Sequence, residues 1–377
     1  MQILIAPDKF KGSCSAPDVA EALARGVRSV DPQSEITIIP MADGGEGTVA
    51  AFIAGGARAL SCTVRGPLET PVHARFALDG TTAIVEMAAA SGLVLLDPRE
   101  RDARRASTYG TGEMIRSALD AGATRLLIGI GGSATNDAGA GMLSALGVRF
   151  LDERGRELEP GGAALACIAS IDMSGLDARL RSIAVTVAAD VDSPLCGRDG
   201  ASVVYGSQKG ASADDIVFLD AALSHFADVV AKTLGNDMRD LPGAGGAGGL
   251  GFALITFLGA KIRAGIDVIA EFQGLPQALQ HADLCLTGEG RIDEQTLRGK
   301  TVAGVLRLAR QTNTPVIAFT GSIDANAEAV LASKGVLVIP ILDRVMNLDE
   351  AIREVSSLLE RAAARAMRAI VLGRDPQ

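Results

Sequence analysis

The stretch "DLCLTGEG", residues 283–290, decides the fold class, because it restarts a strand–helix rhythm that the first 60 residues begin. Two further strand-like runs follow it, "TPVIAFTG" (314–321) and "GVLVIPI" (335–341), with helical patterns between and after them. Near the N-terminus, "ILIA" (3–6) and "ITIIP" (36–40) have the same character. Two early and three late strands predict a doubly wound parallel sheet of flavodoxin-like size.

The middle of the chain has a different pattern. Residues 61–98 alternate like antiparallel strands, and strand-like runs follow at 125–130 and 183–190, with the hairpin-like "VRFLDERGRELEP" (148–160) between them. We therefore predict an α/β protein with two domains. A discontinuous flavodoxin-like domain consists of residues 1–60 and 282–377, and a mixed α/β domain of residues 61–281 is inserted into it.

Composition excludes several classes of function. The 377 residues carry a net charge of −9, which argues against nucleic-acid and anionic-membrane partners. The five cysteines lack a C-x-x-C pair, so a disulfide framework or zinc site is not expected. The start, "MQILIAPDKF", has no signal-peptide pattern, and "GFALITFLGA" is too short to span a membrane. We expect a cytoplasmic protein.

The loops that follow the predicted strands share one chemistry. Nearly all combine Gly, Ser or Thr with an acidic residue, in the segments 7–13, 41–48, 131–137, 190–197, 287–296 and 320–322. Any one of them would be an ordinary turn, but ligands of open parallel sheets bind beyond the carboxyl ends of the strands. Glycine loops that bind phosphate and carboxylates that hold Mg²⁺ are the requirements of phosphoryl transfer.

Two other classes of function remain open at this point. "GIGGSA" (129–134) after a predicted strand, with Asp152 farther along, resembles a dinucleotide fingerprint and would suit an NAD-dependent hydroxyacid oxidoreductase. "GAGGAGG" (243–249) also contains G-x-G-x-x-G, but no strand precedes it, so a flexible helix entry or interdomain loop is as good an interpretation. A non-catalytic regulator that binds a phosphometabolite is the second class.

Five motifs together resemble the bacterial type I glycerate kinase family, glycerate 2-kinase like. They are "APDKFKGS" (6–13), "ADGGEGT" (42–48), "GIGGSATNDAGAGML" (129–143), "PGAGGAGGLG" (242–251) and "TGEGRID" (287–293). The resemblance implies ATP-dependent phosphorylation of D-glycerate, generally to 2-phosphoglycerate, in glyoxylate, glucarate or galactarate breakdown. It also implies an active site in the cleft between the two domains. Ser193 departs from the family's usual Asn in "DVDSPL".

On the basis of this resemblance, we assign candidate roles to the loop residues. We expect Asp190 to orient or deprotonate the acceptor hydroxyl, with Asp192 and Asp8 as alternatives. The expected nucleotide-binding residues are Gly131, Gly132, Ser133, Thr135, Asn136, Gly288 and Gly290. Glycerate or the transferred phosphoryl group would contact Lys9, Lys11, Ser13 and Arg291. Mg²⁺ would lie near Asp43 and Glu46, with Asp293.

The expected cofactors are ATP and Mg²⁺, and the expected partner is D-glycerate, with neither nucleic acid nor membrane. The protein is expected to be a monomer or a homodimer. The 3-phosphoglycerate product stays an alternative, because the 2- and 3-hydroxyls of glycerate differ little in placement.

Overall fold

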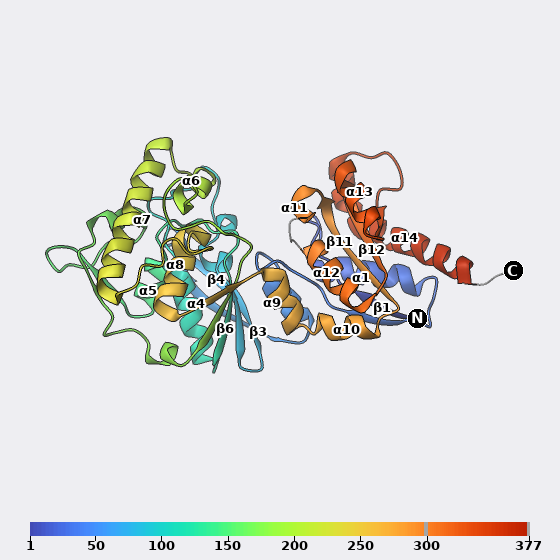
Figure 1. The fold of residues 1–377 in the computed structure, drawn as a ribbon, viewed down its shortest axis with the longest axis horizontal. Coiled ribbons are helices and arrows are strands. Elements are labelled where there is room, and N and C mark those ends of the chain that lie inside the picture. The colour runs from blue at the N-terminus through green and yellow to red at the C-terminus, as the bar shows by residue number, and fades with distance from the viewer. Residues whose placement is uncertain (298–300, 375–377) are drawn as a thin grey trace. The chain divides into compact units, whose positions relative to one another are not determined.

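A computed structural model describes residues 1–297 and 301–374, in two compact units (Figure 1). Unit 1 comprises Met1–Asp43, Ala50–Gly55 and Ile266–Gln377, and unit 2 comprises Gly44–Val49 and Gly56–Gly265. The predicted junctions are near 60 and 281. In the structure, residues 266–281 group with the first unit instead of the insertion, and residues 44–49 and 56–60 group with the second. Helix α10 (Leu275–His281) packs against α12 (Thr301–Thr312) and β1 (Gln2–Ile5), which explains the first of these differences.

Unit 1 is built on a parallel five-stranded sheet. Its strand order is β13-β12-β11-β1-β2, and every neighbouring pair is parallel. The central strands are apolar because helices cover both faces of the sheet. Besides β1, the strands are β2 (Glu35–Ile38), β11 (Leu284–Ile292), β12 (Val316–Ile323) and β13 (Leu337–Pro340).

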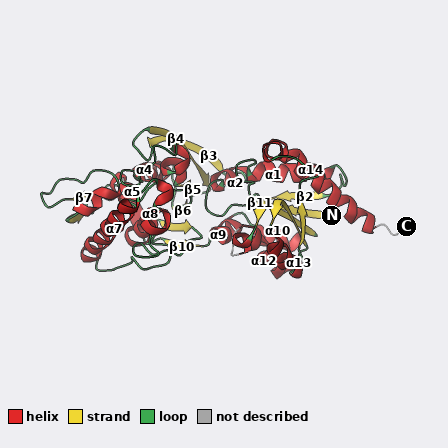
Figure 2. Cartoon of the chain, turned by 90° about the horizontal axis from the view of Figure 1, so that it is seen from above, coloured by secondary structure: helices red, strands yellow, loops and turns green. Residues whose placement is uncertain are grey.

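The helices of unit 1 lie on both sides of this sheet. Figure 2 shows α1 and α14 on one side and α10, α12 and α13 on the other. The helices α1 and α14 also pack against each other and share one apolar core with β1, β11 and β12. The remaining bounds are α1 (Ala16–Arg28), α2 (Thr48–Ala54), α9 (Gly265–Phe272), α11 (Glu294–Leu297), α13 (Ala325–Ser333) and α14 (Leu348–Arg374).

Two loops predicted in this unit are wrong in part. Residues 287–292 were expected to belong to an exit loop, but they continue β11, and the expected loop 320–322 lies within β12. The parallel ladder extends because Arg291 stays in register with Ser322 and Ile292 with Ile323. The predicted nucleotide-binding residues Gly288 and Gly290 are therefore strand residues.

Unit 2 contains a mixed six-stranded sheet in the order β10-β9-β6-β5-β4-β3. The pairs β3–β4 and β4–β5 are antiparallel, as the alternation in residues 61–98 predicts, and the other pairs are parallel. The α/β class, with one parallel and one mixed sheet, is thus confirmed. The strands are β3 (Arg58–Arg65), β4 (Pro71–Asp79), β5 (Thr82–Glu86), β6 (Arg125–Gly129), β9 (Ala184–Ala188) and β10 (Lys261–Arg263).

The predicted hairpin at 148–160 is correct only in part. Its first strand, β7 (Arg149–Leu151), pairs with β8 (Ser170–Asp172), and the hairpin itself keeps a single bridge between Leu151 and Glu157. The polar segment after β7 forms a turn because the Asp152 carboxylate accepts hydrogen bonds from the backbone N–H groups of Arg154 and Arg156.

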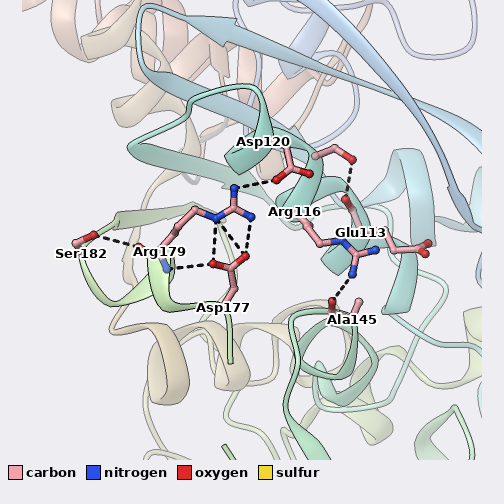
Figure 3. Close-up of polar contacts among 8 residues, drawn as sticks. Glu113, Arg116, Asp120, Ala145, Asp177, Arg179 and Ser182 are labelled. Atoms are coloured by element: carbon pink, nitrogen blue, oxygen red, sulfur yellow. Dashed lines mark hydrogen bonds and ion pairs between the residues drawn. The ribbon is translucent and has the colours of Figure 1, made fainter. Parts of the chain in front are cut away.

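Helices of unit 2 surround its sheet, with α4 packed on β3, β4 and β5, and α8 on β9 and β10. In Figure 3, Arg116 of α4 donates to the Ala145 carbonyl of α5 at 3.0 Å, and Arg179 bridges Asp120 and Asp177. The Arg179 pairs are partly exposed, so they position these segments more than they stabilise them. The helices are α3 (Ala88–Ser91), α4 (Tyr109–Asp120), α5 (Ala140–Ala145), α6 (Ala201–Tyr205), α7 (Ala213–Leu234) and α8 (Gly246–Leu258).

In the part of the chain that the structure describes, no helix combines the length and the apolar character that crossing a membrane requires.

Candidate active site

Four parallel strands of unit 2 end side by side at one edge of its sheet. Glu86 of β5 is in register with Gly129 of β6, Gly129 with Ala188 of β9, and Ala188 with Arg263 of β10. The loops that follow these strands therefore emerge next to one another. The carboxyl edge of a parallel sheet is where ligands of α/β proteins bind.

The segment Gly44–Val49 packs directly on this edge. A Cβ atom on Gly44, whose φ is +85°, would lie 2.7 Å from both the Cβ and the carbonyl oxygen of Ala188. A Cβ on Gly129 would overlap the Gly44 carbonyl oxygen. The Val49 N–H donates to Glu86 Oε1 at 2.6 Å. Only glycine allows so close an approach of two backbones, so "DGGEG" is a packing motif as well as a turn.

The loop 131–137, predicted to bind the nucleotide, has an exposed beginning and a buried end. Gly132 is exposed and Gly131 half-buried, whereas Thr135 and Asn136 have no exposed surface. Ser133, which is 7% exposed, lies at the transition. The side chains of Thr135 and Asn136 therefore face the interior of unit 2, and only the first three residues offer groups to a ligand at the surface.

The end of this loop is anchored by Asp137, which we did not predict as a site residue. Its fully buried carboxylate accepts hydrogen bonds from Thr108 N and Oγ1, both at 2.8 Å, and from Gly139 N at 3.1 Å. Burial raises the pKa of Asp137, and these hydrogen bonds act in the opposite direction. An acid placed just before a helix, α5, was the available signal, since such residues satisfy free N–H groups.

The glycine-rich segment 243–249 packs against the backbones of loops 131–137 and 190–197. Ala247, Gly248 and Gly249 have left-handed φ values. A Cβ on Gly248 would overlap the Thr135 carbonyl oxygen, and one on Gly245 would overlap that of Pro194. The interdomain interpretation of this segment is wrong, because these contacts all lie within unit 2. The glycines allow α8 to begin directly against loops 131–137 and 190–197.

Lys209 is a second residue that sequence reasoning missed. It is 1% exposed, and its Nζ donates to the Thr135 carbonyl oxygen at 2.7 Å. Burial lowers the pKa of Lys209 to about 7, and the charge of Asp137 acts in the opposite direction. Nothing in the spacing of "SQKGAS" marks its lysine as buried, since lysines are usually exposed.

The candidate catalytic acids of unit 2 lie just beyond β9. Asp190 is exposed, and its Oδ1 accepts a hydrogen bond from Gly265 N at 3.0 Å, which ties the loop after β9 to the first residue of α9. Asp192 is exposed as well. Ser193, the residue that departs from the family pattern, has its Oγ 3.4 Å from the Tyr205 hydroxyl.

In unit 1, three predicted residues gather at the end of β1. Asp8 is buried and accepts hydrogen bonds from Lys9 N at 2.7 Å and from Thr301 Oγ1 at 2.6 Å. Burial raises the pKa of Asp8; the nearby charge of Asp43 raises it further, and that of Lys9 lowers it. Asp8, Lys9 and Asp43 therefore form one electrostatic group.

Other predicted residues of unit 1 have local roles. Ser13 Oγ donates to the Phe10 carbonyl at 2.9 Å, and Lys11 is exposed. Arg291, also exposed, has its Nε 3.6 Å from Asp293 Oδ2, while Asp293 Oδ1 accepts from Thr296 N at the start of α11. Glu46, an exposed residue, belongs to unit 2.

Across residues 1–297 and 301–374, no three His, Cys, Asp or Glu side chains are grouped as a metal site.

Comparison with known proteins identifies the family. The model of the "Glycerate kinase family" matches residues 3–371. The chain belongs to the glycerate kinase family. It is 50% identical to a glycerate kinase of Bacillus subtilis over 96% of both chains, and 44% identical to the glycerate 2-kinase of Escherichia coli over 99% of both. A crystal structure of a putative glycerate kinase 2 from Salmonella typhimurium, 44% identical, matches with a TM-score of 0.90 over 99% of both chains.

Family membership makes the chain an enzyme, a kinase that transfers a phosphoryl group to an alcohol acceptor, and it implies ATP as the phosphate donor. This finding argues against both the oxidoreductase and the non-catalytic regulator. The structure explains the false signal at Asp152. Its carboxylate accepts hydrogen bonds from Arg156 and closes a polar turn.

Replacing Gly44 with Ala tests the packing of the glycine loop. The new Cβ would strike Ala188, so we expect a loss of about 1–3 kcal/mol in unfolding free energy. Turnover of glycerate should fall about tenfold or more, because displacements of about 1 Å at a site cost up to about 10²-fold. Gly56→Ala is the matched control, since Gly56 has a φ of +102° but no atom within 4 Å of the position that a Cβ would take. If Gly44→Ala and Gly56→Ala lowered the unfolding free energy in urea and the turnover of glycerate by equal amounts, the packing role of Gly44 would be contradicted.

Proposed function

We propose that the protein transfers the γ-phosphoryl group of ATP to D-glycerate and forms 2-phosphoglycerate. The observation that carries this proposal is the row of strand ends in unit 2, where the exposed start of loop 131–137 lies beside the Asp190 loop. The E. coli relative is named glycerate 2-kinase, which supports the choice of product.

The phosphates of ATP are assigned to the main-chain N–H groups of Gly131, Gly132 and Ser133. Backbone N–H groups in a glycine loop bind phosphate oxygens without any positively charged side chain. Thr135 and Asn136, which were predicted to take part, support the loop from inside because both are fully buried. Gly288 and Gly290 belong to β11, so we assign no phosphate contact to them.

The acceptor hydroxyl is assigned to Asp190. Its hydrogen bond to Gly265 N fixes the direction of an otherwise exposed carboxylate. A carboxylate held in this way orients a hydroxyl group and accepts its proton as the phosphoryl group is transferred. Asp192 is the alternative in the same loop. Asp8 is a weaker alternative because it is buried and already accepts hydrogen bonds from Lys9 N and Thr301 Oγ1.

The residues at the end of β1 fit a magnesium ion. Asp8 and Asp43 are close enough for their charges to interact, and Mg²⁺ is commonly held by one or two carboxylates together with substrate phosphates. Bound magnesium would neutralise charge on the phosphates. Asp43 is therefore the first choice as a ligand, while Asp293 caps α11 and Glu46 groups with unit 2.

Positive charge for the glycerate carboxylate or the transferred phosphoryl group is assigned to Lys9, Lys11 and Arg291. Lys9 belongs to the same electrostatic group as Asp8, and the other two side chains are exposed. Ser13 is assigned a structural role in the turn, since its hydroxyl donates to Phe10.

We also propose that unit 1 is flavodoxin-like. Counted along the unit, its strands lie in the order 2-1-3-4-5, which is the flavodoxin order, and this supports the proposal. The shared cleft, the cytoplasmic location and the choice between monomer and homodimer stay predictions.

Phosphorus NMR of the reaction product tests the function. The protein is incubated with ATP, Mg²⁺ and D-glycerate, and the expected product signal is that of 2-phosphoglycerate, together with ADP. The 3-phosphoglycerate signal would reject the proposed regiochemistry, and the absence of any glycerate-dependent ADP would reject the kinase reaction itself.

Asp190→Asn tests the acceptor role. The amide oxygen still accepts from Gly265 N, but the residue no longer accepts a proton, so we expect kcat to fall about 10²-fold or more. The KM for ATP should change little. Asp199→Asn, an exposed neighbour in the sequence, serves as the control. Near-normal turnover of Asp190→Asn would show that Asp190 is not the group that accepts the proton of the acceptor hydroxyl.

Asp43→Ala tests the metal assignment. Removing one carboxylate ligand should raise the Mg²⁺ concentration for half-maximal activity about tenfold. Glu21→Ala, which removes an exposed acid from α1 of the same unit, should leave the magnesium titration as it is in the wild type. A titration unchanged by Asp43→Ala would reject this ligand.

A further inference from the structure

Lys209 is a charged residue for which the proposed reaction has no role. It lies in the short 3₁₀ helix η4 (Ser207–Lys209) of unit 2 and is 1% exposed. Burial of an ammonium group costs free energy unless the group is paired and hydrogen-bonded. An apolar side chain of the same length would avoid this cost. The contacts of the ammonium group should therefore explain why a lysine stands here.

The side-chain nitrogen of Lys209 donates a hydrogen bond to loop 131–137, which we assign to the nucleotide. The acceptor is the Thr135 carbonyl oxygen, 2.7 Å from Nζ and two residues beyond Ser133. The interior of this loop is poor in hydrogen bonds. Thr135 Oγ1 and Asn136 Oδ1 are buried without a hydrogen-bond partner among the described residues. The other polar atom of the Asn136 side chain, Nδ2, donates to Ser202 Oγ at 2.9 Å. Without Lys209, the Thr135 carbonyl would lose its hydrogen bond from the ammonium group.

The lysine is held in place from several sides. Lys209 N donates to the Gly206 carbonyl at 3.0 Å, and the next residue, Gly210, turns the chain with a φ of +90°. The charge of Asp137, the buried anchor of the same loop, favours the protonated form of Lys209. The Arg101 guanidinium donates to the carbonyl of Gln208, the residue before Lys209, at 3.1 Å.

Main-chain hydrogen bonds to the segment Ser91–Leu93 hold the first part of the loop. The Gly132 carbonyl accepts from Leu93 N and Ala134 N donates to the Ser91 carbonyl, both at 2.9 Å. Asp137 fixes the end of the loop, where its carboxylate accepts from Thr108. Between Ala134 and Asp137, Lys209 supplies the hydrogen bond to the main-chain carbonyl of Thr135.

We propose that Lys209 is a positioning residue for the nucleotide site. The hydrogen bond from its buried Nζ holds the main chain at Thr135, so that the N–H groups of Gly131, Gly132 and Ser133 keep one arrangement toward a phosphate. Lys209 itself does not touch the substrate, because it has almost no exposed surface. The proposal rests on the nucleotide role of the loop proposed above.

Lys209→Met tests the proposal, since methionine is unbranched and lacks the charge and the donor. We expect hydrogen–deuterium exchange in peptides covering residues 131–137 to become about tenfold faster or more, because the buried hydrogen bond from Lys209 Nζ to the Thr135 carbonyl is lost. The dissociation constant for ATP should rise about tenfold, while the KM for glycerate changes less than about twofold. Lys232→Met, on the exposed side of α7, is the matched control and should change neither quantity.

Unchanged exchange in Lys209→Met would overturn the proposal, and so would a loosened loop with wild-type affinity for ATP. If the methionine variant does not fold, Lys209→Gln decides by the same two measurements. Its shorter side chain should not reach Thr135, so the same losses are expected. The kinase function is judged separately, by glycerate-dependent ADP release from the wild-type protein, and its failure would leave the exchange result on the loop intact.

Discussion

The close backbone contact between the Gly44–Gly45 pair and the ends of β6 and β9 is the constraint on which the candidate site depends. It leaves no room for a Cβ atom at Gly44, Gly129 or Gly131. The contact brings the segment Gly44–Val49 to the carboxyl edge of the sheet in unit 2, and Glu86 secures it there by accepting from Val49 N. Two glycine-containing segments far apart in sequence, 44–49 and 129–131, are thereby held against each other.

Two buried ionisable side chains then hold the main chain near this edge through hydrogen bonds. Asp137 and Lys209 are both enclosed in the interior, and both act on the main chain around loop 131–137. Such groups are costly to bury and costly to leave unpaired, so a change in one of them disturbs its partners. Their hydrogen bonds fix the end of the loop directly after Gly131, Gly132 and Ser133, an arrangement that suits phosphate binding by backbone N–H groups.

Prediction from the sequence succeeded where local pattern determines structure. Apolar runs such as "ILIA" and "RLLIGI" became buried strands because an element covered on both faces must be apolar throughout. It failed where the outcome depended on a distant partner. The glycines of β11 resembled a loop but continue a strand, because β12 offers a ladder in register. Residues 266–281 joined unit 1 because α10 packs on α12 and β1.

The sequence by itself determined the α/β class and the family, since strand periodicity and motif spacing are local properties of the chain, and it indicated the loops to which we assign the chemistry. Only the tertiary structure decided which members of those loops face solvent and which face the interior. Asp190 remained exposed and Thr135 became buried, although both follow strands and both are polar. The burial of Lys209 and Asp137 was likewise invisible in the sequence, because the partners that stabilise a buried charge are brought together only when the chain folds.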